Sequence, residues 1–239
     1  IFMKEISYHI AAVFVIIVVA ICYHINKKTS FFHNKCYMIF LWSIALSSVA
    51  AIFTDGLIDI LNIKIDGVKY AFEWIYHVIH AMCAPSALLY VISLRRELGD
   101  LNISERIALV VPFTLVEFLI VTNPMTDYVF SVENMVYSRE PGMFFLYLTA
   151  TYYLVYIIIY MILHRKHYLR SVVVAISVIV VMASGAVLIQ MIFPKQRIEN
   201  FAMSLAALTI LLVIQNPVSV IDTEYNLYNR DSFISITRY

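Results

Sequence analysis

Seven apolar runs dominate the sequence, and each is close to the length of a helix that crosses a lipid bilayer. Such a helix needs roughly 20 mostly apolar residues to cross about 30 Å of hydrocarbon. Because backbone N–H and C=O groups must be paired inside the bilayer, runs of this length predict α-helices. The sequence therefore predicts an all-α integral membrane protein, a seven-transmembrane helix bundle within residues 1–217. The runs cover residues 6–25, 37–54, 71–94, 107–122, 142–163, 171–193 and 200–216.

The composition supports a membrane protein and excludes several other classes. The 239 residues are 62% hydrophobic and only 14% charged, whereas soluble domains average about a quarter charged residues. The formal net charge of +1 indicates neither a nucleic-acid partner nor an acidic substrate. The three cysteines have no CxxC spacing and predict no disulfide or metal framework. The expected partner of most of the surface is the lipid bilayer.

The distribution of lysine and arginine predicts the orientation of the bundle. Cytoplasmic loops of membrane proteins carry an excess of these residues. The loops after the first, third and fifth runs, together with the tail, carry eleven of the seventeen lysines and arginines, and the opposite side carries six. We therefore expect the N-terminus outside and the C-terminus in the cytoplasm.

A polar, tyrosine-rich segment follows the last run at residues 222–233, with the sequence DTEYNLYNRDSF. It resembles the opening of GGDEF (diguanylate cyclase) domains, which is commonly D-x-L-T-G-L-x-N-R-x-x-F. Glu224, Tyr225 and Asn226 replace the L-T-G centre of that pattern. The residues that match at the same spacing are Asp222, Leu227, Asn229, Arg230 and Phe233.

This resemblance implies that residues 218–239 form a short linker and the opening segment of a truncated GGDEF-like domain. GTP and magnesium are then implied only for the output domain beyond Tyr239, and no cofactor for the chain itself. Because diguanylate cyclases work as dimers, a homodimer of the full-length protein is implied as well. The expected function is that of a sensory input module for cyclic-di-GMP signalling in the bacterial cytoplasmic membrane. The chain itself is expected to hold no catalytic residues, and whether its parent is an active diguanylate cyclase stays open.

Other proteins with seven helices match the sequence less well. A retinal protein needs a lysine in its seventh helix, and the run 200–216 contains none. The segment NPVSV at 216–220 is similar to the NPxxY motif of G-protein-coupled receptors, but Val220 stands in place of the tyrosine. A stand-alone multi-pass transporter or membrane scaffold with an incidental polar tail remains the alternative.

Ionisable and amide side chains inside the runs indicate a candidate ligand site, because polar groups at membrane depth are costly and are usually paired or functional. Glu73, His77 and His80 follow an i, i+4, i+7 spacing, which places them on one helical face. Glu117 of the fourth run and Gln190 of the sixth lie in the same outer half of the bundle. We expect these five side chains to converge on a polar patch that is reached from outside and binds an unknown small ligand or ion.

Three interpretations of this patch stay open at the level of sequence. In the first, the carboxylates are neutral or paired with the histidines and only fix the helix packing. In the second, the patch senses a small molecule, an ion or a proton. In the third, it binds a metal ion, since Glu and His are suitable zinc ligands, but a further helix would then have to complete the coordination.

Overall fold

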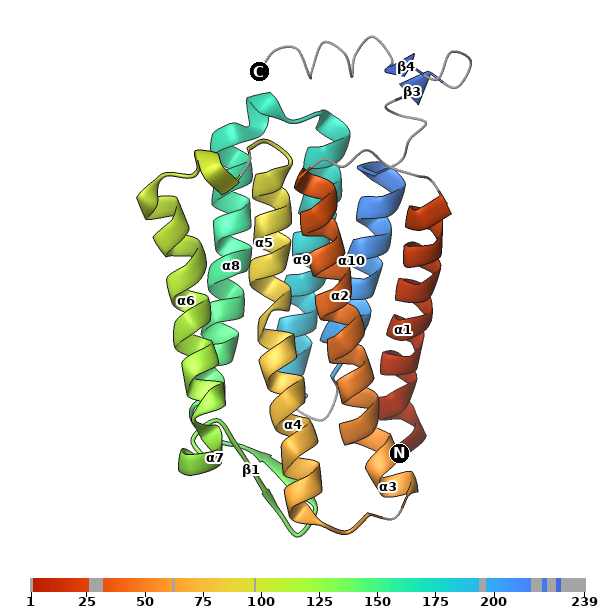
Figure 1. Ribbon diagram of the computed structural model, residues 1–239, viewed down its shortest axis with the longest axis vertical. Helices are drawn as coiled ribbons and strands as arrows, with labels where there is room; N and C mark the ends of the chain where they lie inside the picture. The colour runs from red at the N-terminus through yellow and green to blue at the C-terminus, as the bar shows by residue number, and fades with distance from the viewer. Residues whose placement is uncertain are drawn as a thin grey trace.

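The computed structural model describes residues 2–25, 32–61, 63–96, 98–193, 197–215, 221–222 and 227–228. Long helices lie side by side along one axis and form an elongated bundle (Figure 1). The helical elements are α1 (Phe2–Ile25), α2 (Phe32–Ile52), the π-helix η1 (Phe53–Leu57), α3 (Ile58–Ile60), α4 (Asp66–Ala81), α5 (Cys83–Ser93), η2 (Leu98–Asp100), α6 (Ile103–Val121), α7 (Asn123–Thr126), α8 (Met143–His164), η3 (Arg165–His167), α9 (Arg170–Ile192) and α10 (Glu199–Val213). The strands are β1 (Phe130–Glu133), β2 (Val136–Arg139), β3 (Ile221–Asp222) and β4 (Leu227–Tyr228).

Five helical segments of the described chain are long and apolar enough to cross a membrane, which confirms the expectation of a helical membrane protein. They are Ile6–Ile25, Phe32–Leu57, Asp66–Ser93, Met143–His167 and Arg170–Ile192. Two further helices, α6 and α10, run alongside them (Figure 1). α10 has only 15 residues, α6 carries Glu105, Arg106 and Glu117, and neither is among the five segments that are long and apolar enough.

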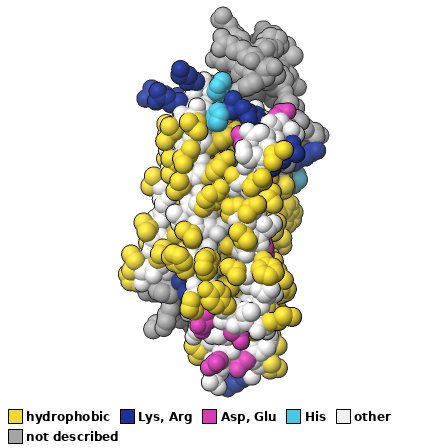
Figure 2. Space-filling view, turned by 90° about the vertical axis from the view of Figure 1, so that its left-hand side faces the viewer, with side chains coloured by type: hydrophobic (Ala, Val, Ile, Leu, Met, Phe, Trp, Pro, Cys, Tyr) yellow, Lys and Arg dark blue, Asp and Glu magenta, His cyan; other side chains and the backbone are white. Residues whose placement is uncertain are grey.

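The surface of the bundle is that of a protein surrounded by lipid. Large apolar side chains are exposed on it, including Phe14 (65%), Leu163 (73%) and Val181 (71%). Contiguous apolar surface of this kind is rare on soluble monomers. Figure 2 shows apolar side chains covering the middle of one face, with Lys and Arg prevailing at one end and Asp and Glu at the other. The upper, basic end is formed by the α5–α6 and α8–α9 connections, which carry Arg95, Arg96, Arg165 and Lys166, and by the first turn of α6, which carries Arg106.

Two prolines interrupt the helical hydrogen bonding at defined carbonyls. Pro85 lacks the N–H that would bond the carbonyl of Ala81, four residues before it, and α4 ends at Ala81. α5 resumes at Cys83, so α4 and α5 together form one interrupted rod. Pro112 likewise frees the carbonyl of Ala108 inside α6, and the hydroxyl of Tyr152 from α8 donates to that carbonyl at 2.9 Å. The second interruption therefore joins α6 to α8.

A β-hairpin that the sequence pattern did not predict closes the lower end of the bundle. β1 and β2 pair antiparallel, and the residues between them, Asn134 and Met135, have φ of 51° and 63°. This left-handed turn docks on the start of α4, where the Asp66 carboxylate accepts from both backbone N–H groups at 3.1 and 2.7 Å. Asn123 accepts from the N–H of Val129 at 2.7 Å and holds the entry to β1. The hairpin thereby brings side chains of β2 over the ends of the helices.

The end of α2 widens into the π-helix η1, where the N–H of Ile58 bonds the carbonyl of Phe53. Such single-turn insertions are frequently found at functional sites. Gly56 of η1 lies against the Ile6 side chain of α1, and a Cβ at this position would collide with it. This close contact sets α1 against η1. The neighbouring side chains of Thr54 and Asp55 are both engaged by Arg197.

Candidate functional site

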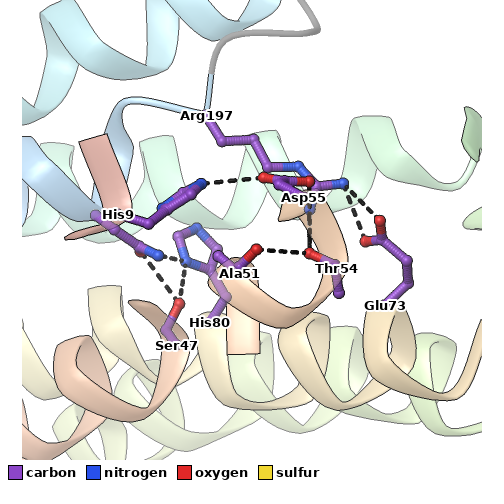
Figure 3. Close-up of polar contacts among 9 residues, drawn as sticks. His9, Ser47, Ala51, Thr54, Asp55, Glu73, His80 and Arg197 are labelled. Carbon is purple, nitrogen blue, oxygen red and sulfur yellow. Dashed lines mark hydrogen bonds and ion pairs between the residues drawn. The ribbon is translucent and has the colours of Figure 1, made fainter. Parts of the chain in front are cut away.

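A buried guanidinium, Arg197, forms the centre of a charge network at the acidic end of the bundle (Figure 3). Its Nη1 lies 3.2 Å from the Asp55 carboxylate and donates to the Thr54 hydroxyl at 3.3 Å. Its Nη2 lies 3.2 and 3.0 Å from the two carboxylate oxygens of Glu73. Arg197 and Glu73 are 7% and 1% exposed. The segment before α10 thus folds back into the bundle and is held there by η1 and α4.

The environment of Arg197 keeps its charge. Burial by itself lowers the pKa of the guanidinium, but the carboxylates of Asp55 and Glu73 outweigh it and raise the pKa well above its ordinary value. The rings of Tyr76 and Tyr137 each lie 4.8 Å from the guanidinium carbon, at cation–π distance. Burial also raises the pKa of Tyr137, so its hydroxyl stays protonated at neutral pH. The arrangement is a largely buried charge cluster with aromatic walls.

The network extends to the first helix through His9. The Nε2 of His9 lies 3.0 Å from the second carboxylate oxygen of Asp55, and the His9 side chain is 1% exposed (Figure 3). Asp55 therefore bridges α1 and the segment before α10. One charged cluster fixes α1, η1, α4 and the entry to α10 relative to one another.

A second cluster is centred on His80 and joins α4, α2 and α10. Its Nε2 lies 2.8 Å from the Glu199 carboxylate, and its Nδ1 lies 3.1 Å from both Ser47 and Asn200. The Ser47 hydroxyl also donates to Asn200 at 3.1 Å. Because Glu199 and Asn200 are the first two residues of α10, this cluster holds the N-terminal end of the last helix.

His77 and Gln190 complete the polar groups of this region. The Nε2 of His77 lies 3.1 Å from the Tyr137 hydroxyl of β2, while its Nδ1 has no hydrogen-bond partner within the described part of the chain. In the orientation that satisfies both ends of its amide, Gln190 donates to Glu199 at 2.8 and 3.0 Å and accepts from Arg139 at 3.3 Å. α9 and the hairpin are thereby connected to the start of α10.

A cavity of about 130 Å³ adjoins these polar groups and separates α8 from α4 and α10. His77, His80, Gln190 and Glu199 line its polar end. The space exists because small side chains face it from α4, α5, α8, α9 and α10 along much of its length. The Ala183-Ser-Gly-Ala186 stretch of α9 gives two alanines to the wall. The alanines of the lining are Ala81, Ala84, Ala87, Ala150, Ala183, Ala186 and Ala206.

The structure brings together four of the five residues that the sequence singled out. His77, His80 and Gln190 line the cavity, and Glu73 lies behind them in the Arg197 network. Glu117 is apart: it is half-buried on α6, does not line the cavity, and its Oε1 has no partner among the described residues. Five of the seven predicted spans correspond to described helices that are long and apolar enough to cross a membrane.

The expected partner of Glu73 was wrong. One of the open interpretations paired it with the histidines of the same helix, whereas the structure pairs Glu73 with Arg197, a residue counted at the level of sequence only as a loop cation. His9 and Tyr137 were missed as well. A usable signal was present, because a buried carboxylate needs a cation and Arg197 lies directly before the last run at the same depth.

The metal interpretation gains no support from the described residues. They contain no group of three or more His, Cys, Asp or Glu side chains placed to hold a metal ion. The physical reason is that Glu73 and His80 turn to different partners, Arg197 and Glu199. The i, i+4, i+7 spacing distributes these side chains between two clusters.

Of the tail motif, two residues fall within the described chain. Asp222 of β3 and Leu227 of β4 are paired antiparallel. Asn229, Arg230 and Phe233 lie outside the described residues.

No protein-family model matches the sequence, and neither a curated protein nor a solved structure matches it.

Proposed function

We propose that this chain is the membrane-embedded sensory module of a cyclic-di-GMP signalling protein of the GGDEF type. The observation that carries the proposal is the position of α10. Its N-terminal end is held by the His80 and Arg197 clusters, its middle lines the cavity, and the chain after it continues into the segment that resembles a GGDEF opening. A change at the cavity therefore has a direct route to a cytoplasmic output domain.

The route runs through a helix that ligand binding can move. Met203, Ala206 and Ile210 of α10 line the cavity together with Glu199 at its polar end. A ligand shifts a conformational equilibrium only by its difference in affinity between two states. A ligand that competes for Glu199 or spreads α8 from α10 changes the position of α10 and so favours one of these states.

The same proposal includes the orientation. It places all seven long helices across the bacterial cytoplasmic membrane, with the N-terminus outside and the basic end of the bundle in the cytoplasm. The concentration of Lys and Arg at the end where α10 finishes supports this orientation. In the full-length protein, GTP and magnesium belong to the output domain, and a homodimer brings two such domains together.

One observation favours the alternative, a stand-alone transporter. Transporters commonly place their sites at interrupted helices near the middle of the bilayer. The break between α4 and α5 lies beside the cavity, since Ala81 and Cys83 both line it. A transporter moves its ligand across vesicle membranes, whereas a sensory module binds the ligand and changes the cyclic-di-GMP level.

The test compares cyclic-di-GMP in cells that carry the complete protein as wild type, Ala183→Leu or Val181→Leu. Ala183 lines the cavity, while Val181 is on the same helix and 71% exposed. We expect Ala183→Leu to change the cyclic-di-GMP level by about fivefold, the lower end of typical allosteric coupling, and Val181→Leu to leave it unchanged. Equal levels in all three proteins, or coding sequence after Tyr239 without a GGDEF-like domain, would refute the proposal.

A further inference from the structure

We infer that the connection between α8 and α9 binds the phosphate head group of an anionic phospholipid. Arg165, Lys166 and Arg170 supply the positive charge, and exposed apolar side chains beside them contact the acyl chains. The inference goes beyond the proposed signalling role and does not depend on it, because it concerns the surface of the bundle at its basic end rather than the cavity or the tail.

The three cations share one short connection that is fixed to the bundle. Arg165 and Lys166 begin the 3₁₀-helix η3, and Arg170 is the first residue of α9. The hydroxyl of Tyr168 donates to the Val91 carbonyl of α5 at 3.2 Å and so holds the connection in place. All three cationic side chains are exposed. They are therefore open to a ligand that approaches from outside the protein.

The charge of this connection is not neutralised within the described part of the chain, where the three side chains take part in no ion pair. The neighbouring α5–α6 connection differs in this respect. There, Arg96 lies 3.5 Å from the Glu105 carboxylate. Arg106 donates to the carbonyls of Gly99 and Leu101 at 2.8 and 3.0 Å. The arginines of one connection are thus engaged by the protein itself, whereas the cations of the other can accept an external anion.

The position of the cations favours a lipid over a free anion. Leu163 and Leu169, which flank η3 on its two sides, are 73% and 66% exposed. The connection therefore borders the lipid-facing surface, and Figure 2 shows Lys and Arg directly above the apolar band at this end. A phospholipid places its phosphate at the cations and its acyl chains against the leucines. A free phosphate ion would use only the first of these two contacts.

The residue types suit a phosphate group and a ligand with net negative charge. The planar guanidinium of arginine matches phosphate oxygens with two parallel hydrogen bonds, and lysine adds a compact charge. The segment 164–170, HRKHYLR, contains no acidic residue, so an anionic head group meets no repulsion from it. A zwitterionic head group brings its own cation to the same place and gains less.

The experiment titrates the detergent-solubilised protein with phosphatidylglycerol or phosphatidylcholine of identical acyl chains. Native mass spectrometry gives the Kd of the first bound lipid. A neutral micelle has no charged bilayer surface, so a difference between the two lipids reports a site on the protein. The variants are Lys166→Gln and the triple variant Arg165→Gln, Lys166→Gln, Arg170→Gln. Lys35→Gln is the matched control, because Lys35 is another exposed lysine at the same end, in the first turn of α2.

We expect the wild type to bind phosphatidylglycerol more tightly than phosphatidylcholine. Each Lys or Arg near an anionic head group contributes about 1 kcal/mol, which is about a fivefold change in Kd. Lys166→Gln should therefore raise the Kd of phosphatidylglycerol about fivefold, and Lys35→Gln should leave it unchanged. The triple variant should bind the two lipids equally. A tenfold molar excess of inorganic phosphate over lipid should not displace phosphatidylglycerol, because phosphate makes no contact with Leu163 or Leu169.

Three results would overturn the inference. Equal Kd values of the two lipids for the wild type would mean that no anionic head group is recognised. Equal effects of Lys166→Gln and Lys35→Gln would assign the preference to the charge of the whole end instead of this connection. Displacement of phosphatidylglycerol by inorganic phosphate would mean that the site takes the free ion. The single variant at Lys166 keeps the test decisive if the triple variant does not fold.

Discussion

One guanidinium nitrogen of Arg197 lies 3.2 and 3.0 Å from the two carboxylate oxygens of Glu73, although 124 residues separate them in the sequence. The pair is enclosed at the acidic end of the bundle and shares its guanidinium with Asp55. Because α10 starts two residues after Arg197, this pair anchors the helix that leads to the tail. Its disruption tests how the last helix is held.

Removal of Arg197 should destabilise the protein more than removal of Glu73. Arg197→Met leaves Asp55 with His9 as its remaining partner and Glu73 buried without a cation, and breaking a buried pair in this way costs about 3–5 kcal/mol. Glu73→Gln leaves Asp55 as a counter-charge, so the loss should be smaller. The free energy of unfolding is measured by detergent titration in mixed micelles. Glu117→Gln, at a carboxyl outside the network, is the matched control and should change it little; an effect as large as that of Arg197→Met would contradict this account.

The hydroxyl of Tyr152 should contribute more to the free energy of unfolding when Pro112 is present than when it is replaced. Tyr152→Phe leaves the Ala108 carbonyl of α6 without its donor, at a cost of about 1 kcal/mol for a hydrogen bond inside the membrane. In a Pro112→Ala background the helix itself supplies an N–H to that carbonyl, so the cost of Tyr152→Phe should fall toward zero. A double-mutant cycle on the free energy of unfolding measures the difference. Equal costs in both backgrounds would mean that the hydroxyl does not compensate for the proline.

Two Gly→Ala substitutions should have opposite effects on stability. At Gly56 a Cβ collides with the Ile6 side chain, whereas at Gly185 nothing lies within 4 Å of the added atom. Alanine is favoured over glycine in a helix by about 1 kcal/mol, so Gly185→Ala should raise the Tm. Gly56→Ala should lower the Tm, and in an Ile6→Ala background the same substitution should no longer do so. A lowered Tm in that background would mean that the π-helix itself, rather than Ile6, requires glycine.

Reporter fusions should reveal the proposed orientation. Fusions after Arg96 and Lys166 should be active as cytoplasmic reporters, and fusions after Lys64 and Glu133 as external ones. At the basic end of the bundle, the first site follows α5 and the second lies within η3. At the acidic end, Lys64 lies in the loop before α4 and Glu133 at the turn of the hairpin. Alkaline phosphatase and green fluorescent protein serve as the two complementary reporters. The same location for Arg96 and Glu133 would mean that α6 does not cross the membrane, and the span count would fall.

Residue patterns determined the helices, their approximate ends and the separation of charge along the bundle. The length of each apolar run determined the helices and their ends, because backbone groups in lipid must be paired within one helix. The two interruptions of helical hydrogen bonding were visible as well, because Pro85 and Pro112 each lack the N–H that would bond the carbonyl four residues earlier. The polar side chains at membrane depth were also visible as a set, and Glu73, His77, His80 and Gln190 do gather at one end.

Only the tertiary structure decided which faces of the helices meet. Lipid and protein interior are equally apolar, so a membrane helix shows little contrast between its two sides, and its inward face cannot be derived from the pattern. For this reason Glu117 was placed at the site, although it lies apart on α6 and does not line the cavity. The partner of Glu73 depended on a loop that folds back into the bundle. A contact across 124 residues between a helix and a loop leaves no local pattern, because its energy comes from burying two charges together.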